Sequence, residues 1–144
     1  MYLKISFLFT LFTFIFSVNF NAQEIGKILS AEAADSEFGK VKESVSIKTS
    51  EVNNWIGQTE DKIMFRMANK ELTVLGDSRK LLYSASSYSE NNDTFYLYSK
   101  TKLIELISKG KNQNTSFEIR GSVFTISNGI YTLEYSVPCP PICD

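Results

Sequence analysis

Apolar and polar side chains alternate along most of this chain, which is the pattern of β-strands that bury one face. The stretch 62–68 is the clearest example, because Ile63, Phe65 and Met67 alternate with Lys62, Met64 and Arg66. Counting such stretches predicts about eight strands. They lie at 41–48, 62–68, 72–74, 81–85, 94–98, 116–120, 123–127 and 130–135.

Short connections join the second, third and fourth of these strands. Asn69-Lys70 leaves room for a two-residue turn, which would place Met67 opposite Leu72 and Phe65 opposite Val74. Gly76-Asp77-Ser78 has the composition of a second turn. Connections this short join antiparallel neighbours, so we predict a three-stranded meander.

The last two strands form the clearest hairpin in the chain. Asn128-Gly129 favours a type I′ turn, whose two central residues both need positive φ. Strand 116–120 leads into this hairpin through Gly121. The expected cross-strand pairs are Ile126 with Tyr131, Phe124 with Leu133, and Thr125 with Thr132.

Three segments have helical patterns. Residues 30–38 combine an N-cap residue, Ser30, with Gly39 at the position that often follows a helix. Residues 51–56 fit a short helical turn capped by Ser50. Residues 100–109 fit an amphipathic helix ended by Gly110, with Leu103, Leu106 and Ile107 on one face and an i,i+4 pair between Glu105 and Lys109.

These elements predict an α+β fold with a mostly antiparallel sheet, one amphipathic helix and a short N-terminal helix. An open sheet with the helix across one face is favoured over a partly closed barrel. No repeat or linker divides the chain, so residues 23–144 are expected to form a single domain.

Residues 1–22 have the organisation of a signal peptide. Lys4 precedes an uncharged run, Ile5 to Val18, that is short for a membrane span of about 20 residues. Cleavage is expected after Ala22, which would leave no membrane span. The leader, ending in Asn-Ala-Gln, resembles those of small exported proteins from Gram-negative bacteria of the Bacteroidota type. The resemblance implies a periplasmic or extracellular location and no particular activity.

Composition excludes several classes of function. The formal net charge is −1, and a nearly neutral chain lacks the basic surface that nucleic-acid binding needs. The chain has no histidine, so Ser-His and Cys-His catalytic pairs and histidine-bound zinc or haem are absent. We expect no metal, no cofactor and no catalytic residue of a known motif.

Cys139 and Cys143 are the only cysteines. In an exported protein two cysteines so close together favour a structural disulfide. The alternatives are bridges to another chain, a redox-active pair and a metal site. The last two are disfavoured, because no Lys, Arg or His stands nearby to activate a thiol and two thiolates are too few for zinc.

Two groups of side chains are candidates for function. Tyr96, Tyr98 and Tyr131 could form part of an exposed binding patch, because aromatic rings stack on sugars and peptides. Glu118, Arg120 and Glu134 share the predicted polar face of the last strands. They are either a carboxylate pair for acid–base hydrolysis or solvated cross-strand ion pairs, and the second interpretation is the default for a half-buried sheet.

The sequence therefore favours an exported, non-catalytic domain that binds a protein, a glycan or a surface component. The alternative is a small carrier whose apolar cavity, between sheet and helix, is lined by residues such as Phe65, Leu106, Phe124 and Leu133. A carboxylate-based hydrolase is a third hypothesis. The identity of the ligand and the oligomeric state are not determined at this level.

Overall fold

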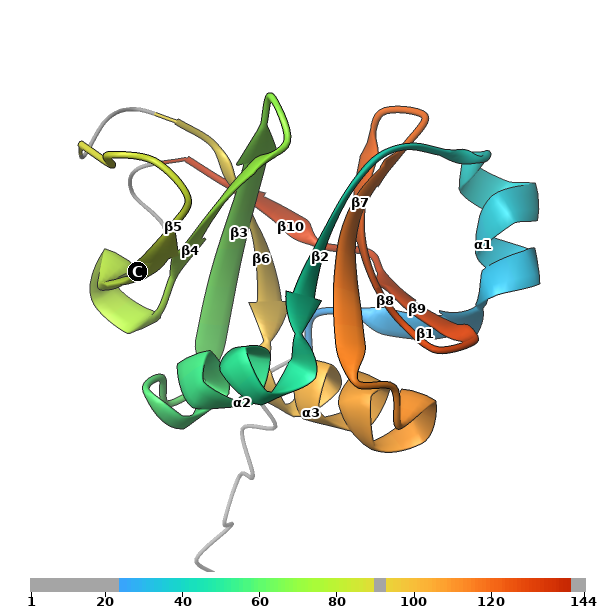
Figure 1. Cartoon of the computed structure of the whole chain (residues 1–144), viewed down its shortest axis with the longest axis horizontal. Coiled ribbons are helices and arrows are strands. Elements are labelled where there is room, and N and C mark those ends of the chain that lie inside the picture. Colours follow the sequence, from blue (N-terminus) through green and yellow to red (C-terminus); the bar gives the residue numbers. More distant parts are fainter. Residues whose placement is uncertain (1–23, 90–92, 141–144) are drawn as a thin grey trace, which may run out of the picture.

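The computed structural model describes residues 24–89 and 93–140, which form two five-stranded antiparallel sheets and three helices (Figure 1). The predicted α+β class and antiparallel pairing are confirmed, but the strands form two sheets, where a single open sheet or a partly closed barrel was expected. Sheet A has the order β1 (Lys27–Ser30), β9 (Tyr131–Glu134), β8 (Val123–Asn128), β7 (Asn114–Arg120), β2 (Val41–Lys48). Sheet B has the order β10 (Val137–Cys139), β6 (Phe95–Ser99), β3 (Lys62–Ala68), β4 (Glu71–Leu75), β5 (Leu81–Ser84).

The structure contains two strands that the sequence pattern did not predict, β1 and β10. Each lies at the edge of its sheet and is short. Strand β10 contains Pro138, which has no backbone N–H to donate and is therefore confined to edges. These segments are strands because β1 pairs with β9 and β10 pairs with β6.

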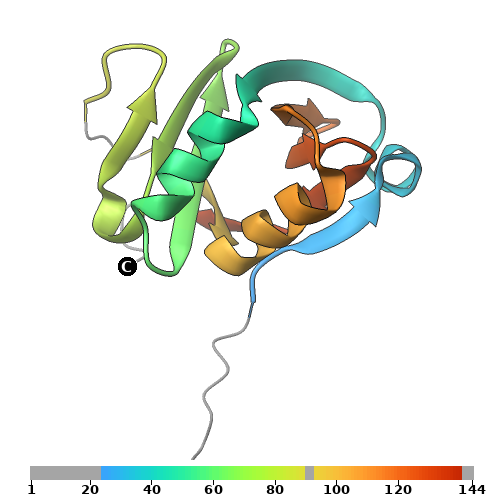
Figure 2. The same cartoon turned by 60° about the horizontal axis from the view of Figure 1, so that its bottom comes forward.

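The main core fills the space between the two sheets, and two helices close one end of it (Figure 2). Helix α2 (Thr49–Gly57) contributes Trp55, and α3 (Lys100–Gly110) contributes Leu103 and Leu106. Each such apolar side chain, when fully buried, stabilises the fold by about 1.5–3 kcal/mol. The sheets contribute Ile63, Phe65, Leu72, Val74, Tyr98, Phe117, Phe124, Ile126 and Leu133.

Side chains alternate along β6, and both faces of the strand are covered. Phe95 and Leu97 belong to a second cluster on the outer face of the sheet. Tyr96 and Tyr98 face the main core instead. The second cluster comprises Met64, Leu75, Phe95, Leu97 and Cys139, with Ile25 and Tyr88 packed against it.

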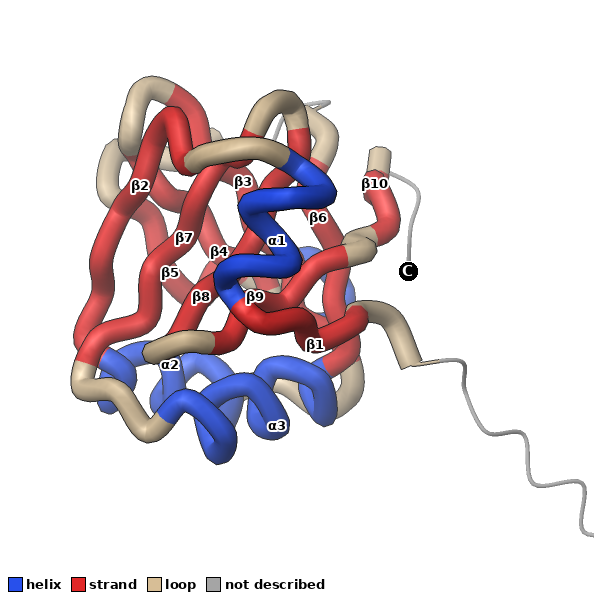
Figure 3. The backbone as a smooth tube through the Cα atoms, turned by 90° about the vertical axis from the view of Figure 1, so that its right-hand side faces the viewer, coloured by secondary structure: helices blue, strands red, loops and turns tan. Residues whose placement is uncertain are grey.

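Helix α1 (Ala31–Phe38) lies on the outer face of sheet A, as Figure 3 shows. Its predicted cap is confirmed, because Ser30 Oγ accepts a hydrogen bond of 3.1 Å from the Ala33 N–H. Ala34 is the only fully buried residue of the helix. A helix with so little apolar contact depends on polar interactions to stay on the sheet.

The two predicted turns have different outcomes. Asn69 and Lys70 have φ of 53° and 60°, as a type I′ turn requires, and the predicted pairs of β3 with β4 are confirmed. The last hairpin has another register than predicted, because Ile126 pairs with Leu133 and Asn128 with Tyr131. Its two turn residues are Gly129, with φ of 61°, and Ile130, which fits a type II′ turn.

The register of this hairpin has a tertiary cause. The side-chain amide of Asn128 donates hydrogen bonds to Thr49 Oγ1 (3.2 Å) and Thr115 Oγ1 (3.0 Å). Its carbonyl oxygen accepts a hydrogen bond from the Asn112 N–H at 2.9 Å. These contacts hold Asn128 in the strand and move the turn one residue along the chain.

Two helix boundaries also differ from the prediction. Helix α2 begins at Thr49, without a side-chain cap from Ser50. Helix α3 runs through Gly110, and the residue that follows it, Lys111, has the left-handed conformation that was expected of the glycine. The predicted ion pair between Glu105 and Lys109 is confirmed at 2.9 Å. Within the described ranges, no helix is long and apolar enough to cross a membrane.

Candidate functional sites

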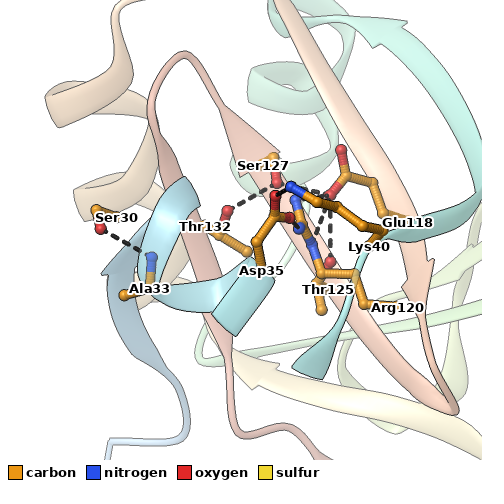
Figure 4. Close-up of polar contacts among 9 residues, drawn as sticks. All are labelled: Ser30, Ala33, Asp35, Lys40, Glu118, Arg120, Thr125, Ser127 and Thr132. Carbon is orange, nitrogen blue, oxygen red and sulfur yellow. Dashed lines mark hydrogen bonds and ion pairs between the residues drawn. The ribbon is translucent and has the colours of Figure 1, made fainter. Parts of the chain in front are cut away.

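Charged and hydroxyl side chains are buried between helix α1 and the outer face of sheet A (Figure 4). We call this group the polar cluster. It contains Asp35 from α1, Glu118 and Arg120 from β7, Thr125 and Ser127 from β8, and Thr132 and Glu134 from β9. The expectation that Glu118, Arg120 and Glu134 are solvated is wrong, because they are 8%, 4% and 0% exposed.

Arg120 joins helix α1 to the sheet. Its Nε and Nη2 donate to Glu118 Oε2 at 3.2 and 2.8 Å, and its Nη1 pairs with Asp35 Oδ1. One guanidinium therefore contacts two carboxylates that come from different elements. Lys40 also pairs with Asp35 and, with Arg120, lowers the pKa of the Asp35 carboxyl.

Hydroxyl groups complete the environment of Glu118. Ser127 Oγ donates to Glu118 Oε2 at 2.9 Å, and Thr125 Oγ1 lies 3.4 Å from the same oxygen. Ser127 also shares a hydrogen bond of 3.0 Å with Thr132. Arg120, Ser127 and Thr125 therefore all contact the same oxygen of Glu118.

Glu134 lies on the same face of the sheet but lacks such partners. Both of its carboxyl oxygens are buried, and neither makes a hydrogen bond of normal geometry within the described part of the chain. Burial raises the pKa of Glu134 to about 8, although the Tyr135 N–H and Arg120 act in the opposite direction. Glu37 and Glu118 add to the increase through charge repulsion. The side chain is therefore mostly protonated at neutral pH.

The polar cluster contains two carboxyl groups in different environments: Glu118 is paired with Arg120, whereas burial raises the pKa of Glu134. However, helix α1 covers it, and the depressions described below are lined by other residues. No group of three or more His, Cys, Asp or Glu in the described residues is arranged to hold a metal ion. In this conformation the cluster attaches α1 to the sheet.

The three tyrosines expected to form a binding patch are not gathered on the surface. Tyr98 is fully buried, and its hydroxyl donates to the backbone oxygen of Phe124 at 2.9 Å. Tyr96 is half-buried and stacks on the Phe124 ring, with centroids 5.0 Å apart. Tyr131 is also half-buried and packs against the main core. The exposure expected of Tyr98 is therefore wrong.

Another tyrosine, Tyr135, lines an open groove of about 370 Å³, which we call the Tyr135 groove. The groove lies where the chain passes between the sheets, next to the edge strands β1 and β10. Tyr135 and Val137 are each 46% exposed. The groove is lined by Glu24, Ile25, Gly26, Tyr135 and Val137.

Both walls of the Tyr135 groove are anchored. Ile25 exchanges two hydrogen bonds with Ser99, at 2.7 and 3.0 Å, which ties the segment before β1 to the end of β6. The Tyr135 ring contacts the edge of Phe38 with centroids 5.8 Å apart, and its hydroxyl donates to Glu37. Lys27 Nζ lies 5.4 Å from the centre of the same ring.

Sequence reasoning did not find Tyr135 as a site residue, because it continues the alternating pattern of its strand. The available signal was the sequence Tyr135-Ser136-Val137-Pro138, since the proline limits continuation of the strand. In the structure Tyr135 has φ of 60°, which turns the chain away from sheet A. That turn exposes the ring.

Of two further depressions on the surface, one is lined by polar residues and the other has a small volume. The first, of about 550 Å³, is lined by Lys48, Thr49, Ser50, Gln113 and Asn114 at the start of α2. The second, of about 190 Å³, lies beside Ile130 and the start of α1. Neither contains an aromatic side chain.

Cys139 is buried in the second cluster on sheet B. Its expected partner, Cys143, lies outside the described residues, as does the signal peptide expected at 1–22. The disulfide and the leader therefore stay predictions.

No protein-family model, curated protein or solved structure matches this chain. The function has to be inferred from the chain's own residues.

Proposed function

We propose that the protein is an exported, non-catalytic binding domain, and that its Tyr135 groove binds an extended segment of a partner protein. The observation that carries this proposal is the pairing of two exposed apolar side chains, Tyr135 and Val137, in one anchored groove. Export is inferred from the leader pattern of residues 1–22.

The chemistry of the groove favours a peptide over a glycan. Three of its five lining residues, Ile25, Gly26 and Val137, have no polar side chain to bind sugar hydroxyls. A groove of about 370 Å³ has room for a short peptide segment carrying an apolar side chain. The adjacent strand β10 is at the edge of sheet B, where an extended peptide commonly finds backbone partners.

The carrier alternative has little support in the packing of the core. The four residues expected to line a cavity, Phe65, Leu106, Phe124 and Leu133, are all fully buried in one cluster. The rings of Phe65 and Phe124 stack with centroids 6.0 Å apart. Side chains that pack against one another leave no room for a ligand between them.

The hydrolase alternative depends on the polar cluster. Glu118 Oε2 already accepts hydrogen bonds from Arg120 and Ser127, and helix α1 lies over the site. Hydrolysis of a glycoside, ester or peptide substrate that is lost in both Glu118→Gln and Glu134→Gln would establish this alternative in place of the binding function.

The proposal can be tested by selecting peptides from a random library displayed on phage, at pH 6, against residues 23–144. Enriched peptides are then measured by fluorescence anisotropy against the wild type and Val137→Asp. Val137→Asp places a charge in the groove, so binding should weaken about tenfold or more, equal to about 1.4 kcal/mol.

Leu81→Asp is the matched control, because Leu81 is 47% exposed and lies on β5, at the far edge of sheet B. This variant should bind the peptides as the wild type does. Equal binding by Val137→Asp and the wild type would show that the groove is not the binding site. A selection without enriched peptides would contradict the proposed function itself.

A further inference from the structure

Glu134 and Tyr135 are adjacent in the chain and both interact with helix α1. The Tyr135 ring contacts Phe38 and its hydroxyl donates to Glu37, so the last turn of α1 positions this wall of the groove. Because the side chain of Leu133 lies in the main core, the buried side chain of Glu134 is on the opposite face of sheet A, which is the face on which α1 lies (Figure 3). The helix thus connects a buried carboxyl group to an exposed binding surface.

The charged groups that act on Glu134 are two carboxylates and one cation. Helix α1 contributes the carboxylate of Glu37, and strand β7 contributes Glu118. The cation is Arg120, but Glu118 and Asp35 already occupy its Nε, Nη1 and Nη2. Two further titratable groups come from neighbouring strands. Lys27 of β1 is paired with Glu134 in the sheet, but its ammonium group lies over the Tyr135 ring. Tyr98 of β6 is a neutral phenol whose hydroxyl donates to the Phe124 oxygen.

An ionised Glu134 would therefore be a buried charge beside two other carboxylates, with no hydrogen bond of normal geometry from the described residues to either of its oxygens. Such a charge is strongly unfavourable unless it reaches water. Helix α1 is short and buries only Ala34 completely, so few apolar contacts oppose its movement away from sheet A.

We propose that helix α1 is a pH-dependent clamp on the Tyr135 groove: it stays on sheet A while Glu134 is protonated, and it is released when Glu134 ionises. Release removes Glu37 and Phe38 from Tyr135, so the wall that Tyr135 forms is no longer held in position and the affinity of the groove for peptides falls. The clamp itself is independent of any ligand, whereas its effect on peptide binding rests on the proposed function.

The direction of the pH dependence follows from the two states of Glu134. With α1 in place the pKa is about 8, and in water it returns to about 4.5. Opening therefore becomes more favourable as pH rises from 4.5 to 8 and then levels off. The groove should be formed in mildly acidic solution and released near pH 8.

Hydrogen–deuterium exchange of the full-length mature chain tests the clamp without a ligand. Protection factors are measured at pH 5 to 9 for a peptide covering α1 and for one covering β8, both corrected for the intrinsic exchange rate. In the wild type the protection of α1 should fall more than a hundredfold between pH 5 and pH 8. Glu134→Gln cannot ionise, so its α1 protection should change less than threefold.

Two results would overturn the clamp. One is α1 protection that does not depend on pH, or that falls equally in Glu134→Gln. The other is equal protection of α1 and β8 at every pH, which would mean that α1 opens only when the whole domain unfolds.

Binding of the selected peptides is a separate readout. Their dissociation constants should rise between pH 5.5 and pH 8 for the wild type and stay constant for Glu134→Gln. Constant affinity in the wild type, alongside pH-dependent exchange of α1, would overturn the link between the clamp and the groove. Absence of any peptide would contradict the proposed function but would leave the exchange result as a test of the clamp.

Discussion

Gly110, the last residue of α3, lies directly against the backbone of Asn128 in strand β8. A Cβ atom added to Gly110 would come within 2.2 Å of the Asn128 backbone oxygen. The glycine is therefore required for a close approach between helix and sheet, and the left-handed residue that ends the helix is Lys111. This contact places α3 at the end of the core.

Gly110→Ala should destabilise the protein by about 1–3 kcal/mol, because the new methyl group would push α3 away from β8. Gly57→Ala is the matched control, since Gly57 also ends a helix but a Cβ there meets nothing within 4 Å. Urea denaturation of both variants measures the effect. Equal stability of the two variants would contradict the close approach of Gly110 and Asn128.

Arg120→Leu should destabilise the protein by about 3–5 kcal/mol, because it leaves Glu118 as a buried carboxylate without its cation. Adding Glu118→Leu should restore much of the loss, since two apolar side chains then replace the ion pair. Thermal or urea denaturation checks both variants. A double variant no more stable than Arg120→Leu would show that the Glu118 charge is not the source of the loss.

Glu134→Gln should stabilise the protein at neutral pH. The pKa of Glu134 is raised in the folded state, so its contribution to stability is fully present below pH 4.5 and is lost as pH rises to about 8. Glu134→Gln cannot ionise, so its free energy of unfolding should exceed that of the wild type by about 3 kcal/mol at pH 7 and differ little from it at pH 4.

Glu118→Gln is the control for this effect, because it makes the same change on the same face of sheet A. It should destabilise at pH 7, since Glu118 is bonded as an anion to Arg120. Urea denaturation at pH 4 and pH 7 separates the two variants. A destabilised Glu134→Gln at pH 7 would mean that Glu134 has a partner when folded.

Tyr98→Phe should cost about 1 kcal/mol, because it removes the hydroxyl that donates to the Phe124 oxygen. Tyr96→Phe keeps the ring that stacks on Phe124 and should be nearly neutral. Neither variant should change peptide binding if the Tyr135 groove is the site. Denaturation and anisotropy together test this, and lost binding in a stable Tyr98→Phe would return the site to the predicted tyrosine patch.

Local patterns correctly predicted most elements where one face of a strand is buried and turns are short. The pairs between β3 and β4 follow from alternation and from the two-residue turn Asn69-Lys70. The cap of α1 at Ser30 and the apolar face of α3 depend only on neighbouring residues, so they too were predictable. These features are local in the chain, and tertiary contacts did not alter them.

Functional residues were harder to predict, because alternation shows which side chains share a face but not what covers that face. The pattern placed Glu118, Arg120 and Glu134 together and left them in solvent. Helix α1 lies over them through the pairing of Asp35 with Arg120, which are 85 positions apart. Similarly, a second layer covers Phe95 and Leu97 and leaves Tyr98 in the main core.

The sequence by itself determined the α+β class, the eight strands β2 to β9, the three helical segments and the absence of histidine chemistry. Tertiary structure alone decided how these elements divide into two sheets, which face each helix covers, the register of the last hairpin and the exposure of Tyr135. The reason is physical: hydrogen bonds of turns and caps and the periodicity of side chains act over a few residues. Burial and charge pairing, in contrast, depend on segments that meet only after the chain has folded.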